Sequence, residues 1–449
     1  MTARPLPPRW VTLVLCDAQG SLLGSLPPFE VAFPYWQEVG DVVAQARDRF
    51  ALQVTVLRLL AATPLPDSPT ASGPVTYLAE LTDLAELTNL AELTGAGVAP
   101  PSNLLRPVDD AVRELALADH RLRLPYARPG GPASDLAWAD GALAASGRSR
   151  TGPAQQQRTW NLSSIWRLPT ADGPVWLKVV PPFFGHEGAM IARLRASPPG
   201  EVGHPEAVAE PIAVDGPRVL LRDVPGTDQY GARGPVLHAM VRTLVAIQAG
   251  WVSRLPELAG LGVPDWRGEP FLAAADDVVR RTAGELDPDT RATVGQLVAE
   301  LPQRFAQLAA CGVPDTLVHG DFHPGNVRAA TGFGVESRAH QPRCVLLDWG
   351  DCGIGHPLFD QSAFLDGLPA GEADAVRVTW SQAWRDAVPG CDPERAAALI
   401  EPVSALRRAT VYRMFLDRIE PTERVYHAAD PRQWLTAAAA LVSRGRARP

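Results

Sequence analysis

The chain has 449 residues, of which 46% are hydrophobic and 20% are charged, and its formal net charge is −8. This composition is typical of a folded protein with two or three domains, and it excludes a largely disordered chain. The excess of acidic residues argues against nucleic acid or an anionic membrane as the main partner.

The cysteines and the apolar stretches indicate the cellular compartment of the protein. Five widely spaced cysteines include no CxxC pair, so we expect reduced thiols and neither a disulfide framework nor a zinc site. The N-terminal stretch MTARPLPPRW lacks the apolar region of a signal peptide, and no apolar run reaches the ~18 residues of a membrane span. We therefore expect a cytoplasmic protein with no membrane partner.

Residues 1–135 predict a separate small α/β domain. Strands are expected at 10–16, 52–60 and 75–81, and a helix at 40–50, from the alternation and spacing of apolar residues.

An internal repeat of LAELT occupies residues 78–95, with a leucine at every third position. On a helix such leucines would spiral around the axis, so we expect a lengthened loop or strand end. Residues 96–108 and 125–134 are rich in proline and glycine and are interpreted as connectors, and 148–158 as another polar stretch.

Residues 150–226 predict a small strand-rich lobe. A hairpin is expected over 160–180 with its turn at 171–174, followed by a helix at 186–196 and a strand at 217–226.

Residues 227–449 predict a larger helical lobe, because most segments after 233 have helical spacing and the main exception is 315–350. The fold class expected from this order is α+β.

The segment VWLKVV contains Lys178, the only lysine beside 41 arginines (42 − 1). An ammonium is a compact point charge on a flexible stem, whereas a guanidinium is a planar fork, so arginine does not replace lysine at every site. Chance survival of one lysine is the alternative.

Two motifs carry the chemistry, LVHGDFHPGNV at 317–327 and CVLLDWGDCGIGHPLFD at 344–360. Phosphoryl transfer needs a carboxylate that orients and deprotonates a hydroxyl, and an oxygen-rich pair that holds Mg²⁺. The candidate base is Asp321, and the candidate metal ligands are Asn326 and Asp348.

Two residues of the smaller lobe complete this interpretation. Lys178 would contact the α- and β-phosphates, and Glu187 would hold the lysine by an ion pair. The alternatives are that Glu187 is a solvated carboxylate at a helix start and that Asp321 is a turn residue. A zinc site at His319 and His323 is a further alternative, but it lacks a third spaced ligand.

The order H-G-D-x-H-P-G-N and D-W-G-D-x-G-x-G-x-P resembles the aminoglycoside phosphotransferase and choline kinase group of the protein-kinase-like fold. The resemblance covers roughly residues 155–440 and implies a two-lobed fold, with a small antiparallel-sheet lobe and a larger helical lobe. It also implies that His319 braces the catalytic loop around Asp321. Asp360 resembles the helix aspartate that supports this loop from behind.

The same resemblance implies a nucleotide site. Adenine would lie against the backbone near Arg222 and Val224. The phosphate-covering loop would be Asn-Leu-Ser-Ser at 161–164, which lacks the glycine common in the group, and its candidate phosphate contacts are Ser163 and Ser164.

The expected activity is ATP- and Mg²⁺-dependent transfer of the γ-phosphate to a hydroxyl of a small molecule. The alternative is a nucleotide-binding regulatory protein with a catalytically weak kinase-like domain. The acceptor, the choice between ATP and GTP, and the oligomeric state stay open. Residues 371–449 contain 12 arginines and 10 acidic residues, which argues against a strongly cationic aminoglycoside.

The N-terminal region faintly resembles a Nudix domain. The metal-binding helix of that family would correspond to residues 44–52, AQARDRFAL. The positions of the family's glutamates carry Gln45, Asp48 and Arg49, so the resemblance implies a scaffold or recognition domain without hydrolase activity. An unrelated α/β domain is the alternative.

Overall fold

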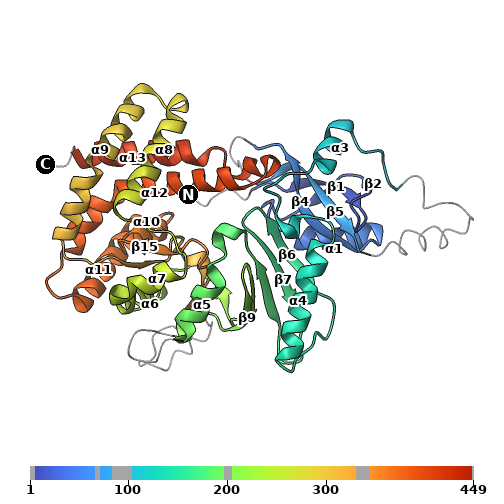
Figure 1. The fold of residues 1–449 in the computed structure, drawn as a ribbon, viewed down its shortest axis with the longest axis horizontal. Coiled ribbons are helices and arrows are strands. Elements are labelled where there is room, and N and C mark those ends of the chain that lie inside the picture. The colour runs from blue at the N-terminus through green and yellow to red at the C-terminus, as the bar shows by residue number, and fades with distance from the viewer. Residues whose placement is uncertain (1–5, 66–70, 83–103, 197–204, 330–342, 447–449) are drawn as a thin grey trace, which may run out of the picture. The chain divides into compact units, whose positions relative to one another are not determined.

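The computed structural model describes residues 6–65, 71–82, 104–196, 205–329 and 343–446 (Figure 1). These residues form two compact units, each built from more than one stretch of the chain. The first unit comprises Met1–Pro182, Arg218–Leu221 and Leu416–Ala428, and the second comprises Phe183–Pro217, Arg222–Phe415 and Ala429–Pro449. The repeat predicted at 78–95 lies outside the described residues beyond residue 82.

The first unit begins with a mixed sheet. Its strands follow the order β2-β1-β5-β4, and β3 also pairs with β1. The pair β1–β5 is parallel, and the other pairs are antiparallel. The strands are β1 (Arg9–Cys16), β2 (Leu22–Ser25), β3 (Phe29–Val31), β4 (Val54–Ala62) and β5 (Gly73–Leu81).

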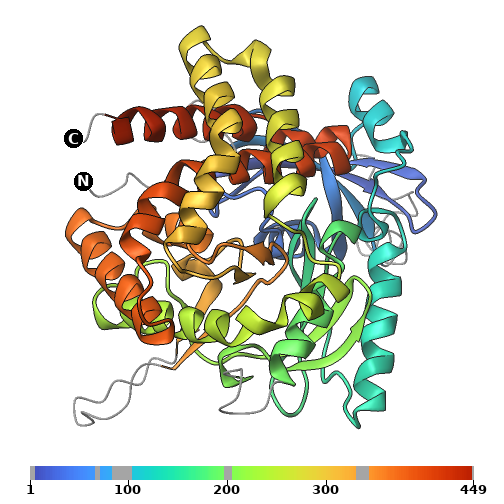
Figure 2. The ribbon, with the colours of Figure 1, turned by 60° about the vertical axis from the view of Figure 1, so that its left-hand side comes forward.

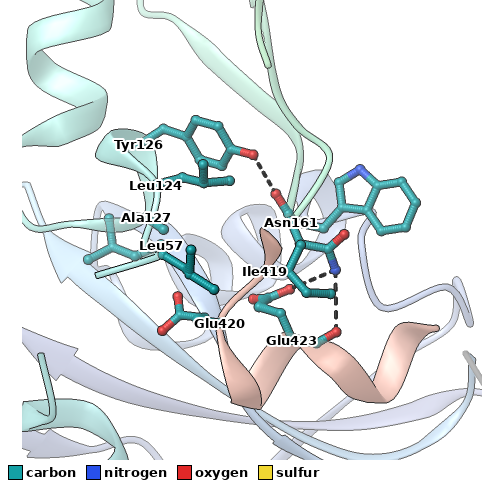
Figure 3. A pocket seen from close by; sticks show the side chains of 10 residues that line it. Leu57, Leu124, Tyr126, Ala127, Asn161, Ile419, Glu420 and Glu423 are labelled. Carbon is teal, nitrogen blue, oxygen red and sulfur yellow. Dashed lines mark hydrogen bonds between the residues drawn. The ribbon is translucent and has the colours of Figure 1, made fainter. Parts of the chain in front are cut away.

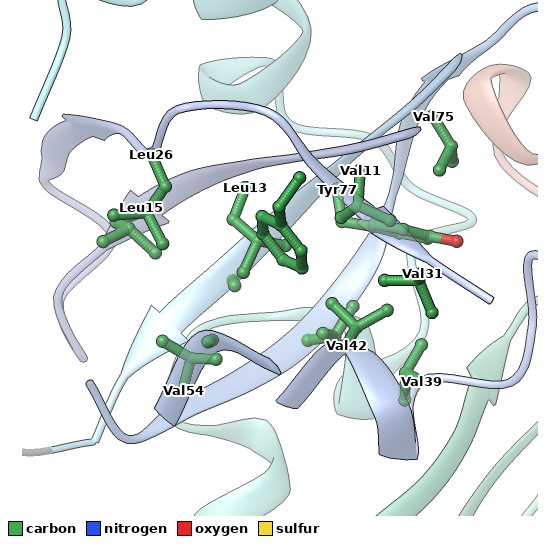
Figure 4. Packing of buried hydrophobic residues seen from close by; sticks show 14 of the residues in the cluster. Val11, Leu13, Leu15, Leu26, Val31, Val39, Val42, Val54, Val75 and Tyr77 are labelled. Carbon is green, nitrogen blue, oxygen red and sulfur yellow. The ribbon is translucent and has the colours of Figure 1, made fainter. Parts of the chain in front are cut away.

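The hydrophobic core on one face of this sheet is formed by apolar residues that alternate with other residues along its strands. Val11, Leu13 and Leu15 of β1 are fully buried and pack with residues of β4, β5 and the helix α1 (Gly40–Phe50) (Figure 4). The predictions of strands at 10–16, 52–60 and 75–81 and of a helix at 40–50 are therefore confirmed within a few residues. Alternation of apolar residues places them on one face of a strand, which is why local sequence was sufficient here.

The helix α1 is the segment to which the Nudix resemblance assigned its metal ligands. Arg49 Nε donates a hydrogen bond to Gln45 Oε1 at 2.6 Å. Ala51 caps the helix in a left-handed conformation with φ 54°. The pair of Arg49 and Gln45 supplies no carboxylate for a metal, and the Nudix resemblance stays a prediction.

A second sheet in the first unit contains β6 (Gln155–Trp160), β7 (Ser163–Leu168), β8 (Val175–Val179) and β10 (Arg218–Arg222) as successive neighbours. The hairpin of β7 and β8 is antiparallel, and Gly173 adopts φ 101° in its turn, as predicted for 171–174. The side chain of Gln156 joins this sheet to the N-terminal one. Its Oε1 accepts from the N–H of Val56 at 2.9 Å, and its Nε2 donates to the carbonyl oxygen of Val56 at 2.7 Å.

One prediction in this unit is wrong. Residues 125–134 were expected to be a connector, but they contain a short 3-10 turn at Pro125–Ala127 and the start of α4 (Gly131–Ala145). The Gly-Gly-Pro sequence indicated a turn, but Pro132 lies in the first turn of the helix, where its missing N–H needs no partner. The unit also contains α3 (Asp110–Leu117).

The stretch 416–428 packs into the first unit around a buried carboxyl group. Glu423 Oε1 accepts from the N–H of Leu59 at 2.8 Å, and Asn161 Nδ2 donates to Oε2 at 3.4 Å (Figure 3). The neighbouring Glu420 is bound by Arg123 through two hydrogen bonds of 3.0 and 2.9 Å. The cavity at this cluster is about 10 Å³, which is the space of a single water molecule.

Burial raises the pKa of Glu423 to about 8 from its ordinary 4.5. The unfolded chain ionises this group from about pH 4.5, whereas the folded chain keeps the proton up to about pH 8. Its contribution to the free energy of unfolding therefore falls as the pH rises through this window, by at most ~1.4 kcal/mol per pH unit.

We expect Glu423→Gln to remove this pH dependence. The free energy of unfolding, measured by denaturant titration from pH 5 to 8, should fall more steeply in the wild type than in the variant. Glu114→Gln, at an exposed position of α3, should retain the wild-type slope. Parallel slopes for the wild type and Glu423→Gln would show that Glu423 is already ionised in the folded chain.

The second unit is mainly helical. In Figures 1 and 2, α8 and α9 run side by side. Its helices are α5 (Glu187–Arg195), α6 (Pro235–Trp251), α7 (Leu255–Gly260), α8 (Gly268–Thr282), α9 (Pro288–Ala310), α10 (Phe359–Leu365), α11 (Ala370–Ala387), most of α12 (Pro393–Arg418) and α13 (Asp430–Arg446). The mainly helical character predicted after residue 233 and the α+β class are confirmed.

Short strands carry the two sequence motifs in this unit. The ribbon β12–β15 is antiparallel, and β11, β13 and β14 form a three-stranded antiparallel sheet. The strands are β9 (Pro211–Asp215), β11 (Thr227–Asp228), β12 (Thr316–Val318), β13 (Val327–Ala329), β14 (Cys344–Leu346) and β15 (Gly353–Gly355).

One described segment, Pro235–Gly260, is long and apolar enough to cross a membrane by length and composition. Half of its most apolar window is buried inside the fold, as in the core helix of a globular protein. All five cysteines lie in the described parts of the chain, where they are buried and form no disulfide bond.

Candidate active site

The loop between β12 and β13 is held by Asp360, the second residue of α10. Its carboxylate accepts from the backbone N–H groups of His319 and Gly320, both at 2.8 Å, and from Gln248 Nε2 at 2.9 Å. Burial raises the pKa of Asp360 to about 6, although the two backbone hydrogen bonds act to lower it. The carboxyl group is therefore mainly ionised at neutral pH. Asp360 thus fixes the start of the loop from the helix.

Gly320 allows a close approach of two backbone segments. It has φ 91°, and a Cβ atom at this position would lie 2.0 Å from the carbonyl oxygen of Asp351. Only glycine fits both the conformation and this contact.

His319 is a fully buried brace. Its Nε2 lies 3.0 Å from the carbonyl oxygen of Leu347, so Nε2 carries the proton and donates it. Burial lowers the pKa of His319 to about 4, which keeps the ring neutral at physiological pH. The ring also packs against Trp349, with centroids 4.5 Å apart. A neutral, buried imidazole of this kind positions the loop and carries no charge to a substrate.

Asp321 follows on the same loop, with its side chain 48% exposed. Asn326 Nδ2 donates to the backbone oxygen of Asp321 at 2.9 Å and to its Oδ2 at 3.2 Å. His323 Nδ1 accepts from the N–H of Gly325 at 3.0 Å, so the proton of a neutral ring is on Nε2, which lies 3.5 Å from Asp321 Oδ2.

These contacts set the charge of Asp321. Desolvation raises its pKa, but the hydrogen bond and the charge of His323 outweigh this effect and hold the pKa below its usual value. The carboxylate is therefore ionised, oriented and about half exposed.

Asp348 and Asn326 lie at adjacent strand ends. Val327 of β13 pairs with Leu346 of β14, and the N–H of Leu347 donates to the carbonyl oxygen of Asn326 at 2.8 Å. Asp348 has φ 61°, a left-handed conformation that is rare for a residue other than glycine. Such strain is often found at functional positions.

The metal implied by the sequence can be tested against these residues. Since the amide nitrogen of Asn326 is directed at Asp321, its oxygen is the atom that remains for a cation. Across the described ranges, no group of three or more His, Cys, Asp or Glu side chains could hold a metal by itself. An amide oxygen and a carboxylate fit Mg²⁺, which commonly takes one or two protein ligands together with substrate phosphates.

Glu187 begins α5 and is buried. Its Oε1 accepts from the N–H of Trp349 at 3.2 Å, directly after Asp348. In the second unit, the structure thus brings Glu187 together with the Asp348 segment.

Three predicted site residues lie in the first unit. Lys178 is on β8, opposite Ile165 of β7. Ser163 and Ser164 begin β7, and their buried hydroxyl oxygens accept from the indole N–H groups of Trp160 and Trp166, each at 3.1 Å. The roles of these residues in nucleotide binding stay predictions.

Arg222 and Val224, which were predicted to lie near adenine, belong to the second unit. Arg222 ends β10, its N–H donates to the carbonyl oxygen of Glu210, and its guanidinium pairs with the Glu210 carboxylate at 2.8 Å. Their adenine contact also stays a prediction.

Two supporting residues were missed in the sequence. Gln248 of α6 contacts Asp360, and the buried Arg407 of α12 donates to the carbonyl oxygens of Gly320 and Asp351, at 3.3 and 3.4 Å. They lie 112 and 87 residues from their partners, and no local pattern marks them. Only the polar character of a residue in an apolar helical stretch could have drawn attention to Gln248.

The chain is similar to several solved structures at low sequence identity. A macrolide 2′-phosphotransferase from Brachybacterium faecium is 16% identical, with a TM-score of 0.43 over 65% of this chain and 97% of its own. A choline/ethanolamine kinase family protein from Mesorhizobium loti is 17% identical, with a TM-score of 0.47 over 70% of this chain and 98% of its own. No curated protein sequence matches the chain.

The model of the phosphotransferase enzyme family matches residues 155–399, which are more than half of the 449 residues and include both motifs. The family predicted from H-G-D-x-H-P-G-N and D-W-G-D is thereby confirmed, and the chain belongs to the phosphotransferase enzyme family.

Proposed function

We propose that this enzyme transfers the γ-phosphoryl group of ATP to a hydroxyl group of a small molecule, with Mg²⁺ as cofactor. The observation that carries the proposal is the position of Asp321. Its ionised, half-exposed carboxylate is oriented by Asn326 and His323 on a loop clamped by Asp360.

In the proposed step, Asp321 Oδ accepts the proton of the acceptor hydroxyl while the oxygen of that hydroxyl attacks the γ-phosphorus. The bond from phosphorus to the β–γ bridging oxygen breaks, and ADP leaves with that oxygen. The products are a phosphate monoester and ADP. General-base assistance of this kind contributes ~10²–10⁴-fold to a rate.

The other residues have supporting roles in the proposal. Asn326 and Asp348 would hold Mg²⁺, whose charge offsets that of the phosphates. His319, Asp360 and Gly320 keep the loop in place.

A screen of hydroxyl metabolites tests this function. The full chain is incubated with ATP or GTP, Mg²⁺ and each compound, and phosphorylated products are detected by mass spectrometry. We expect at least one acceptor that gains a single phosphate group in a Mg²⁺-dependent reaction. Calorimetry showing tight nucleotide binding, with no transfer to any compound, would favour a regulatory protein instead.

We expect Lys178→Arg to weaken productive nucleotide use, because a guanidinium has a different reach and shape from an ammonium. The loss in kcat/KM for the nucleotide should be about tenfold, which corresponds to ~1.4 kcal/mol, while KM for the acceptor changes little. Arg167→Lys, at a partly exposed position of β7, serves as the matched control. Unchanged kinetics in Lys178→Arg would remove the special role of the lysine.

A further inference from the structure

The second unit contains a pocket that the phosphotransfer site does not use. Its volume is about 380 Å³, within the range of small-molecule sites. The last turn of α9 and the residues that follow it form one wall, and the start of α8 forms another. The apolar part of these walls includes Trp266, Phe305, Leu308 and Val313.

This pocket lies at the end of the β12–β15 ribbon remote from the catalytic loop. Asp315 precedes β12, and His356 follows β15, and both line the pocket. Thr316 pairs with Gly355 at this end, whereas Val318 pairs with Gly353 at the end that leads to Asp321. The pocket is therefore separate from the loop that carries the proposed base.

Asp315 brings a negative charge to the pocket, which the charge of Arg267 offsets only in part. This carboxylate makes no hydrogen bond or ion pair with the residues that the structure describes. Arg267 lines the same pocket, but its guanidinium is bound by Asp265 through two hydrogen bonds of 2.9 and 2.8 Å. The charges of Arg267 and Asp265 cancel, so these two residues and Asp315 together leave a net charge of −1 at the pocket.

The helix α9 adds to this negative potential. It has 23 residues and ends at the pocket wall, where the negative end of its dipole favours a cation. Burial raises the pKa of Asp315, and the charge of Arg267 opposes this rise.

His356 contributes an unused donor. Its Nδ1 accepts from the N–H of Leu358 at 3.3 Å, so the proton of the neutral ring is on Nε2. Burial lowers the pKa of His356 to about 3, and the buried Nε2 has no hydrogen-bond partner among the described residues. The lining thus combines the Asp315 carboxylate, the Arg267 guanidinium held by Asp265, the buried His356 ring and apolar side chains.

We propose that this pocket binds a small monovalent amine with an apolar body of one or two rings, whose ammonium group pairs with Asp315. A net charge of −1 at the pocket matches one positive charge, and a polycation would leave its further charges desolvated and unpaired. This binding does not depend on phosphotransfer.

The test uses 2-phenylethylamine and its neutral isostere 2-phenylethanol with the full chain in the absence of nucleotide. Calorimetry should show the amine binding at least about tenfold more tightly than the alcohol, as expected for a charge-assisted hydrogen bond. Asp315→Asn should abolish this preference. Ala309→Phe, at an exposed position of the lining, should weaken both ligands by occupying the pocket.

Two variants serve as controls. Asp289→Asn, at the opposite and exposed end of α9, and Asp321→Asn, in the phosphotransfer loop, should both bind the amine as the wild type does. Absence of binding, equal affinity for amine and alcohol, or an unchanged preference in Asp315→Asn would overturn the proposal. Loss of amine binding in Asp321→Asn alone would place the amine at the phosphotransfer site and overturn it as well.

Discussion

Asp321→Asn should lower kcat for phosphotransfer by ~10²–10⁴-fold while the fold and the nucleotide affinity persist. The amide has the shape of the carboxylate, and its oxygen can still accept from Asn326 Nδ2, which lies 3.2 Å from Asp321 Oδ2 in the wild type. What is lost is the basic oxygen that accepts the proton of the hydroxyl. The measurement is kcat at saturating nucleotide and acceptor, with nucleotide affinity determined separately by calorimetry.

Asp374→Asn is the matched control for this variant. Asp374 is 76% exposed on α11 and pairs with Arg377 on the surface, so the same change in charge should leave kcat near the wild-type value. Turnover of Asp321→Asn within threefold of the wild type would refute its assignment as the base.

Gly320→Ala should destabilise the chain by ~3 kcal/mol or more and abolish transfer. The added Cβ would lie 2.0 Å from the carbonyl oxygen of Asp351, and no side-chain rotation can relieve a contact with backbone. The φ of 91° adds strain for any residue with a Cβ atom. The free energy of unfolding from denaturant titration and kcat should both fall.

Gly295→Ala, in the same unit, should have the opposite effect on the free energy of unfolding. Gly295 is exposed within α9, and a Cβ there meets nothing within 4 Å. Alanine should stabilise the helix by ~0.5–1 kcal/mol, with normal turnover. If Gly320→Ala and Gly295→Ala had similar stability, the close backbone contact at Gly320 would be refuted.

Much of the architecture could be predicted because it follows from local patterns. The alternating apolar residues of 10–16 and 75–81 predicted β1 and β5, and the helical spacing of 186–196 predicted α5. The motif HGDFHPGN predicted that Asp321 and Asn326 share a loop, and the structure places them in direct contact.

The remainder depends on contacts between distant parts of the chain. Asn161 and Glu423 are 262 residues apart, and Asp360 and Gln248 are 112 residues apart, so neither pair has a local signature. The helix α4 was missed because Gly131 and Pro132 indicate a turn as readily as a helix start. The conformation of Asp348 depends likewise on its surroundings and not on its own propensity.

The central claim is that Asp321 deprotonates an acceptor hydroxyl that takes the γ-phosphoryl group. The most direct measurement is a single-turnover reaction with ATP labelled at the γ-phosphate, with the wild type and Asp321→Asn compared on the acceptor found by screening. We predict that label appears on the acceptor oxygen with one ADP formed per phosphate ester, and that the variant forms this ester at least a hundredfold more slowly. Label released only as inorganic phosphate, or an ester formed equally fast by both proteins, would contradict the account.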